Sequence, residues 1–562
     1  MPSASPPPDR TVAVPVAAPP PKPSHNTPDG DAAPSASTAP PARLAALAPL
    51  SLPVFRMLWL TWVVANTCMW MNDVATAWLM TTLTTSPVLV ALVQSASTLP
   101  VFLLGLPSGA LADILDRRRY FIVTQFWVAG VALVLCTAIL LEGMTAPLLL
   151  ALTFANGIGL AMRWPVFSAI VPELVSRAQL PAALALNGVA MNASRIIGPL
   201  LAGAIIASLG SAWVFVLNAV LSVLAGLVIM RWQRTHVPSP LGRERLPSAM
   251  RVGLQFVRQS PRLQAVLWRI SLFFLNGTAL MALLPLVAKG LDGGGAGTFT
   301  VLLASMGAGA IGAALWLPRL RQAFARDTLV MGGTTVQAAG MALVAVAPSV
   351  WLAVPAMLIS GMAWITAANS LSVSAQLALP NWVRARGMSI FQMAIMGSTA
   401  LGAALWGQVA TLTSVNTSML LAAGTGVLAM VLVQRLAQDR HAEEDLSPSQ
   451  AWQPPQAAIA PEAGRVLTTI EYWIDPARAV DFLALMQESK RSRLRQGALS
   501  WQLQHDIADP RRYVEQIVDE SWTEHLRRFD RVTASDVALR ERKLAFHVAE
   551  TPPVIARYLV ER

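Results

Sequence analysis

The chain has 562 residues, of which 54% are hydrophobic and only 13% are charged, and its formal net charge is +11. Because a soluble chain usually carries about 25% charged residues, this composition excludes a soluble enzyme, a disordered scaffold and a disulfide-stapled secreted domain. It indicates a polytopic helical membrane protein.

The excess of positive charge belongs to the apolar middle of the chain. Residues 52–436 hold 22 lysines and arginines against 8 acidic residues, whereas residues 437–562 hold 17 against 20. Cations beside hydrophobic spans act as signals of membrane topology, and an acidic C-terminal segment argues against nucleic-acid binding. We therefore expect the lipid bilayer, and no nucleic acid, among the partners.

The N-terminal segment, residues 1–51, is predicted to be a disordered arm. The first 50 residues contain 14 prolines among Ala, Ser and Asp, without an apolar run long enough to span a membrane. Such a composition favours extended, polyproline-like chain over packed structure. Any apolar stretch begins only after more than forty residues, which is not the pattern of a cleaved signal peptide.

Twelve apolar stretches follow one another from residue 56 onward. Each is long enough to cross a hydrocarbon core of about 30 Å. They are predicted at residues 56–82, 87–111, 120–142, 147–174, 183–208, 212–232, 264–288, 298–317, 328–347, 351–379, 387–410 and 416–436. A polar break after the sixth separates an N-terminal six-helix bundle (52–236), a central cytoplasmic loop (237–262) and a C-terminal six-helix bundle (263–437). The predicted class is thus an all-α polytopic membrane protein with 12 transmembrane helices.

The cations between these stretches lie in alternate loops. The loops on one side carry the arginine groups, including 117–119 and 319–321, whereas the opposite loops carry only Lys289. Since lysine and arginine are enriched in cytoplasmic loops, both termini are predicted to lie in the cytoplasm and the protein in the inner (plasma) membrane.

A second type of structure is predicted at the C-terminal end. Residues 438–464 lose hydrophobicity and gain Pro, Gln and acidic residues, as in a linker. Residues 465–562 then show alternating and helical periodicities, which predict a small cytoplasmic α+β domain. Strands are expected at 466–474, 499–507 and 513–519, and helices at 476–493, 522–531 and 535–547.

The loop after the second apolar stretch carries a motif, since residues 109–119 read GALADILDRRR. Small residues let two helices approach closely, and a carboxylate here can pair with cations or with a helix N-terminus. The segment resembles the motif that joins the second and third helices of the major facilitator superfamily, where it latches the two halves in the outward-facing state. The resemblance implies that fold, and a gating role for Gly109, Asp113, Asp116, Arg117 and Arg118.

The fifth apolar stretch contains Gly198, Pro199 and Gly203. Proline opens the helical hydrogen-bond ladder, and glycine permits bending and close packing. The segment resembles the Gly-Pro motif of exporters in the superfamily, which implies a helix-bending role for these three residues.

Further segments resemble one branch of that superfamily, the enterobactin-exporter-like transporters, also called transmembrane secretion effectors. They include Pro100 and the segment 172–175, and in the tail Trp501 and the segment 521–525. The tail resembles ferredoxin-like domains related to antibiotic-biosynthesis monooxygenases, some of which are enzymes that act on aromatic substrates. This likeness leaves open catalysis, regulation or self-association through the C-terminal domain. The tail histidines show no metal-ligand spacing, so we expect no metal, no cofactor and no enzymatic activity.

Three ionisable residues, Asp73, Arg163 and Arg195, lie at membrane depth in the predicted spans. An unpaired charge at the bilayer centre costs at least about 2.5–3.5 kcal/mol, so such residues normally face a cavity or each other. Two interpretations remain open. The charges form a buried Asp–Arg pair that sets helix register, or they line a substrate and proton path together with Asn72 and Gln94.

These features predict secondary active transport, with protons and a small-molecule substrate as partners. The expected activity is proton-coupled export of a small amphipathic molecule such as a siderophore, antibiotic or drug-like compound, by two bundles rocking about a central site. The alternatives are a membrane-tethered monooxygenase-like enzyme that acts through residues 465–562, and a receptor derived from a transporter.

Overall fold

The computed structural model describes residues 47–561 with internal gaps. The gaps are residues 115, 177–178, 232–245, 292–293, 381, 437–444, 450, 453–454 and 456–463. The predicted N-terminal arm up to residue 46, part of the predicted central loop and most of the predicted linker therefore lie outside the described residues.

All twelve predicted spans are helices, of 20 to 31 residues. The first six are α2 (Pro53–Leu83), α3 (Pro87–Ile114), α4 (Arg117–Leu140), α5 (Ala146–Leu174), α6 (Leu180–Leu209) and α7 (Ser211–Met230). The second six are α9 (Pro261–Gly290), α10 (Ala296–Ala323), α11 (Arg326–Val346), α12 (Val350–Leu377), α13 (Arg384–Leu412) and α14 (Val415–Leu436). With a rise of about 1.5 Å per residue, even the shortest can cross a bilayer core.

Local sequence explains where several of these helices begin and end. Helices α2, α5, α6 and α9 each have a proline in the first turn. Backbone N–H groups in the first turn have no acceptor within the helix, so a proline there costs no hydrogen bond. Helices α6 and α7 are separated by Gly210, whose φ of 94° is a left-handed conformation that glycine adopts without strain.

Eleven of the helices in the described part of the chain are long and apolar enough to cross a membrane. The remaining long helix is α2, which carries Arg56 and Asp73 together with two asparagines. Both of them, Asn66 and Asn72, are buried. The first predicted span is thus a helix whose asparagine side chains lie inside the protein.

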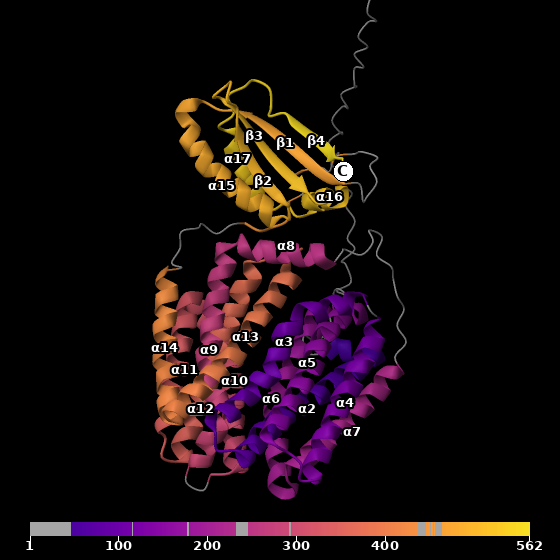
Figure 1. Ribbon diagram of the computed structural model, residues 1–562, viewed down its shortest axis with the longest axis vertical. Coiled ribbons are helices and arrows are strands. Elements are labelled where there is room, and N and C mark those ends of the chain that lie inside the picture. Colours follow the sequence, from indigo (N-terminus) through magenta and orange to yellow (C-terminus); the bar gives the residue numbers. More distant parts are fainter. Residues whose placement is uncertain are drawn as a thin grey trace, which may run out of the picture. The chain divides into compact units, whose positions relative to one another are not determined.

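The two groups of helices, α2–α7 and α9–α14, meet mainly along two pairs of helices (Figure 1). Helix α3 lies against α13, and α6 lies against α10. A buried hydrogen bond joins the first pair, because the Ser95 hydroxyl donates to the Ala400 carbonyl at 2.7 Å. The two-bundle arrangement predicted from the sequence is confirmed.

The central segment contains a helix where the sequence analysis expected only a loop. Helix α8 spans Leu246–Arg258 and is amphipathic, with Val252 and Phe256 buried. It packs against α13 and against α15 of the C-terminal domain. The Gln255 side chain donates to the Ala498 carbonyl at 2.8 Å, and Arg251 forms an ion pair with Glu520 at 2.7 Å. The short apolar face of α8 was overlooked because its flanks are polar.

The C-terminal domain is an α+β domain with a four-stranded antiparallel sheet in the order β2-β3-β1-β4. The strands are β1 (Arg465–Trp473), β2 (Ser500–His505), β3 (Arg512–Asp519) and β4 (Ile555–Val560), and the helices are α15 (Ala479–Arg495), α16 (Trp522–Asp530) and α17 (Ala534–Leu544). The predicted strands and helices are confirmed, and β4 is an addition that the sequence analysis missed. Alternation along β1 buries Val466, Thr468, Ile470 and Tyr472 on one face.

Candidate functional sites

The two arginines at membrane depth lie over tryptophan rings of α2. The guanidinium carbon of Arg163, on α5, is 5.7 Å from the centre of the Trp62 ring, and that of Arg195, on α6, is 5.4 Å from Trp70. Arg163 is 5% exposed, and its buried Nε has no hydrogen-bond partner among the described residues. Contact with an aromatic face partly compensates a cation for lost water.

Asp73 is half-buried on α2. No hydrogen bond or ion pair involving its side chain is found in the described part of the chain, so the two arginines do not pair with it in this conformation. Asp73 is therefore a carboxylate in a membrane helix without a fixed counter-charge. The interpretation of a permanent Asp–Arg pair is not favoured by this geometry.

The two amides predicted beside Asp73 lie in different settings. Asn72 is buried and accepts a hydrogen bond of 3.5 Å from Asn218 on α7, which is the behaviour of a polar contact between helices. Gln94, on α3, is half-buried, and only its backbone carbonyl takes part in hydrogen bonds among the described residues, with Ser97 and Thr98. Of the two, Gln94 retains a free side-chain amide.

The Gly-Pro segment lies where α6 is most tightly packed. A Cβ at Gly198 would stand 2.5 Å from the Cβ of Trp70 on α2, and a Cβ at Gly203 would stand 2.1 Å from the Thr300 hydroxyl on α10. Helix α6 continues through Pro199 to Leu209. Gly203 thus permits close contact between the two bundles, which is the close packing that the sequence pattern predicts beside helix bending.

The motif for which a gating role is predicted joins α3 and α4. Gly109 and Asp113 lie in the last turns of α3, and Arg117 begins α4, but the side chains of Asp113 and Arg117 lie outside the described part of the structure. The Asp116 carboxylate accepts hydrogen bonds from the backbone N–H groups of Arg118, at 2.8 Å, and Arg119, at 3.1 Å. It therefore caps the N-terminus of α4.

Arg118 of the same motif is tied to another helix. Its guanidinium donates to the Met230 carbonyl at the end of α7. The contact holds the start of α4 beside the end of α7 within the N-terminal bundle. In this conformation Arg118 therefore has a structural partner in its own bundle.

Contacts between the bundles are found at the helix ends that lead into the predicted outer loops. The Lys289 ammonium donates to the Thr81 carbonyl at 2.8 Å. Trp78 stacks on Phe299 with ring centres 6.4 Å apart, and the Val88 N–H donates to the Thr411 hydroxyl at 3.2 Å. These contacts close that end of the interface between the bundles.

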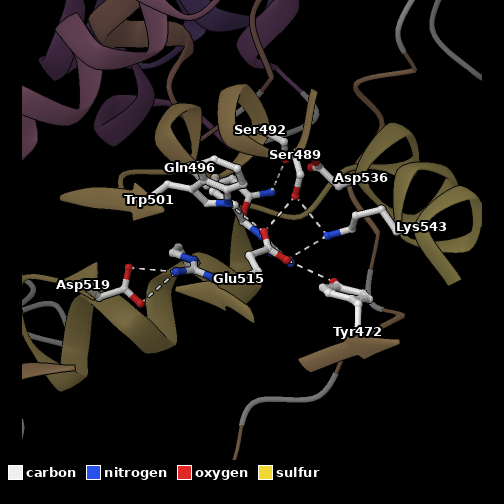
Figure 2. A network of polar contacts seen from close by, with 11 residues as sticks. Tyr472, Ser489, Ser492, Gln496, Trp501, Glu515, Asp519, Asp536 and Lys543 are labelled. Carbon is white, nitrogen blue, oxygen red and sulfur yellow. Dashed lines mark hydrogen bonds and ion pairs between the residues drawn. The ribbon is translucent and has the colours of Figure 1, made fainter. Parts of the chain in front are cut away.

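A second site lies in the C-terminal domain, where Glu515 is completely buried on β3 (Figure 2). Its carboxylate accepts hydrogen bonds from Tyr472 at 3.0 Å, Ser489 at 2.9 Å and Trp501 at 2.8 Å. Lys543 of α17 lies 3.2 Å away as its ion-pair partner. The carboxylate is thus enclosed by donors from a neighbouring strand on each side and from both packed helices.

This environment keeps Glu515 ionised. Burial alone raises the pKa of Glu515, but Lys543, Arg493 and the hydrogen bonds from Trp501 and Ser489 together hold it well below its usual value of 4.5. Burial lowers the pKa of Lys543 to about 8, although the Glu515 carboxylate acts in the opposite direction. The pair is therefore charged at neutral pH.

Asp519, at the end of β3, contacts a second set of buried polar side chains. It accepts a hydrogen bond of 2.7 Å from Nδ1 of His525 and lies 2.9 Å from the Arg528 guanidinium. Burial opposes its ionisation, but Arg528 and His525 still lower the pKa of Asp519. The other ring nitrogen of His525 accepts from Arg557 of β4 at 3.3 Å. The spacing of the tail histidines gave no indication of this contact.

No group of acidic, histidine or cysteine side chains among the described residues could hold a metal ion. The two cysteines, Cys68 and Cys136, are buried and free.

Comparison with solved structures shows which fold the chain shares with known proteins. The nucleoside transporter NupG matches with a TM-score of 0.55 and 14% identity, over 69% of this chain and 99% of that one. A bacterial homologue of the human lysosomal transporter Spinster, in an inward-facing and unoccupied conformation, matches with a TM-score of 0.54 and 13% identity, over 68% and 94%. At such identities the likeness shows the fold alone, which is that of the major facilitator transporters.

The family follows from the sequence of nearly the whole chain. Residues 44–562 match the family described as transmembrane secretion effector, and the protein belongs to this family. The narrower likeness to enterobactin exporters, and that of the tail to monooxygenase-related domains, remain predictions.

Two curated relatives share part of the sequence. The staphyloferrin A transporter of Staphylococcus aureus is 25% identical over 256 residues, which are 45% of this chain and 63% of the relative. Macrolide efflux protein A of Streptococcus pyogenes is 26% identical over 213 residues, which are 36% and 51%. The chain thus covers less than two thirds of each of these relatives.

Proposed function

We propose that this protein is a secondary active exporter of a small amphipathic molecule, such as a siderophore or an antibiotic. Family membership, the two-bundle fold and relatives named for a siderophore and for macrolide efflux support the proposal. It places the protein in the plasma membrane with both termini in the cytoplasm, as the distribution of cations favours.

Asp73 is the group through which we propose proton coupling. The supporting observation is its half-buried carboxylate on α2, without a fixed ion-pair partner among the described residues. Arginine keeps its charge at any working pH, so Arg163 and Arg195 cannot carry the proton. They contribute positive charge to the same bundle, and Gln94 offers a free amide to a substrate.

The contacts at the predicted outer ends support a state that is closed to the outside. Lys289 with Thr81, and Trp78 with Phe299, join the bundles there. For an exporter this is the state that loads substrate from the cytoplasm, and the motif at 109–119 is proposed to latch the opposite state. Gly203 against Thr300 provides the close contact about which the bundles move.

The test uses purified protein in liposomes with an imposed pH gradient and, as substrates, staphyloferrin A and a macrolide. The wild type is expected to accumulate at least one of them against its gradient. Asp73→Asn is expected to abolish accumulation but to retain downhill exchange, because the neutral side chain can no longer exchange a proton. Asp73→Glu retains a part of the coupling.

Glu142→Gln, at an exposed carboxylate beyond α4, is the control and is expected to transport like the wild type. Uphill transport by Asp73→Asn with an unchanged pH profile would remove Asp73 from the mechanism. Removing residues 465–562 separates the exporter from the enzyme alternative, because efflux that persists in the truncated protein cannot depend on chemistry in the tail.

A further inference from the structure

Arg195 of α6 is a cation whose donors are not used by the protein. The side chain is half-buried, and its guanidinium makes no hydrogen bond or ion pair with another described residue. It lies over the ring of Trp70, which is itself half-buried. The Nε of Arg163 is fully buried, but no nitrogen of Arg195 is. The Arg195 guanidinium is therefore accessible to a molecule that enters the space beside it.

The face of α6 that carries Arg195 points towards the region between the two bundles. Successive residues of a helix are rotated by about 100°, so Arg195 lies between Gly198, which packs against α2, and Gly203, which packs against α10. Ile197 and Leu200 lie on the opposite side of α6 and are exposed, at 47% and 46%. Such exposed apolar positions of a membrane helix face lipid, so Arg195 faces the interior of the protein.

Both arginines at membrane depth reach one face of α2. Trp62 and Trp70 are eight residues apart and Asp73 follows three residues later, so these side chains lie within about 80° of one another around the helix. Arg163 contacts the first ring and Arg195 the second, at levels separated by about 12 Å along the axis of α2. Two cations and one carboxylate are thus gathered on this face.

This face has an excess of one positive charge even when Asp73 is ionised. Neither arginine pairs with Asp73 or with another acidic side chain among the described residues. Because a charge at membrane depth is costly, it normally faces a partner or a cavity. A bound monoanion balances the excess, whereas a phosphate monoester with nearly two negative charges exceeds it. The planar fork of arginine matches the two oxygens of a carboxylate.

We propose that the transported molecule carries a carboxylate, and that this carboxylate binds the Arg195 guanidinium beside Trp70. Arg163 adds positive potential from the level of Trp62. The inference rests on the proposed function, because it names the charge class of the molecule that the exporter carries.

The test is equilibrium dialysis of 4-phenylbutanoate at neutral pH against the full chain in phosphatidylcholine nanodiscs, with empty nanodiscs as the blank. The alcohol 4-phenylbutan-1-ol and the amine 4-phenylbutan-1-amine have nearly the same shape, so the three probes differ mainly in charge. Because hydrogen bonds between charged groups are the strong ones, the carboxylate is expected to bind at least about tenfold more tightly than the alcohol. The amine is expected to bind more weakly than the carboxylate.

Two variants of one residue locate the site. Arg195→Met is expected to remove the preference for the carboxylate over the alcohol. Arg195→Lys keeps the charge but not the planar fork, so it is expected to keep the preference at a severalfold lower affinity. Arg326→Met is the matched control, because Arg326 is an exposed arginine at the start of α11, away from this face of α2.

A third variant separates this inference from proton coupling. Asp73→Asn removes a negative charge one turn from Trp70, so it is expected to bind 4-phenylbutanoate more tightly than the wild type. Binding is measured without a gradient. Uphill transport by a protein without the carboxylate preference would therefore overturn this inference alone, and carboxylate binding without any transport would overturn the proposed function alone.

Equal affinities for the carboxylate and the alcohol would overturn the inference, and so would tighter binding of the amine. An unchanged carboxylate preference in Arg195→Met would also overturn it, because the anion would then bind elsewhere in the chain. Thermal unfolding within a few degrees of the wild type shows that each variant is folded.

Discussion

Buried charges occur in the C-terminal domain and in the N-terminal bundle, and the two regions differ in the partners that these charges have. In the C-terminal domain each buried carboxylate has fixed partners: Glu515 has Lys543 and three hydrogen-bond donors, and Asp519 has Arg528 and His525. In the N-terminal bundle the arginines lie over indole rings, and Asp73 has no partner among the described residues.

A charge with fixed partners suits a structural role, and a charge without a fixed partner suits a functional role. A buried ion pair with complete hydrogen bonding holds one arrangement, and removing one partner leaves the other charge uncompensated. A charge kept in a membrane helix without a fixed partner is costly, and it is retained where a cavity, a substrate or a proton uses it. The geometry of Glu515 is thus that of a structural residue, whereas Asp73 is the residue for which we propose a function.

The largest expected effect is that of Glu515→Gln. The substitution leaves Lys543 buried without its counter-charge, so it is expected to destabilise the C-terminal domain by about 3–5 kcal/mol. Hydrogen exchange measured by mass spectrometry on peptides of β1 and β3 reports this change in the full chain.

The matched control is Glu471→Gln in the same sheet. Glu471 forms an ion pair with Arg512 at 3.0 Å, but both side chains are about one third exposed, at 30% and 37%. Exposed pairs contribute about 0–1 kcal/mol, so this variant should exchange nearly as slowly as the wild type. If Glu515→Gln is equally harmless, the buried network is not what holds the domain together.

A smaller effect is expected from acid. Glu515 has a lower pKa in the folded domain than the 4.5 of the free side chain, so below pH 4.5 the unfolded chain binds the additional proton. The stability that Glu515 contributes is present above that pH and is lost as the pH falls towards its folded pKa, by at most about 1.4 kcal/mol per pH unit. Exchange rates corrected for intrinsic pH dependence measure the slope, and Glu515→Gln is expected to reduce it.

The smallest effect on stability is expected for Arg195→Met in the N-terminal bundle. Methionine removes a cation that has no acidic partner among the residues that the structure describes, so no opposite charge is left buried, and only the contact with Trp70 is lost. Such contacts contribute about 0.5–2 kcal/mol, which the relief of burying a charge offsets. Thermal unfolding should change by a few degrees at most, while transport falls. Unfolding as severe as that of Glu515→Gln would show that Arg195 is structural.

The sequence allowed much of the fold to be predicted, and the errors have physical causes. The strand β1 was predicted to within one residue and the helix α15 to within three, because strict alternation and helical spacing are local signals. Strand β4 was missed because it follows Pro552 and Pro553 and is mostly exposed, without alternation in burial. The capping role of Asp116 could have been predicted, since an aspartate directly before a helix is a frequent N-cap.

The candidate sites were less accessible to such reasoning. Asp73, Arg163 and Arg195 were recognised because a charge in an apolar stretch is conspicuous in any sequence. That Trp62 and Trp70 are the neighbours of the arginines was not foreseen, although two tryptophans eight residues apart on one helix were a signal. The Asp519–His525 pair was missed because it depends on the tight turn between β3 and α16.

What the sequence by itself determined is the class of the molecule: apolar stretches of membrane length, alternating positive loops, a superfamily motif at 109–119 and an α+β tail. These follow from local hydrophobicity and periodicity, which any short window of the chain contains. Only the tertiary structure decided which charges are paired, since Glu515 and Lys543 come from different elements and Arg195 is 125 residues from Trp70. Charge interactions change steeply over a few ångströms and with burial, so the packing of distant segments determines whether a buried charge holds the fold or remains available for function.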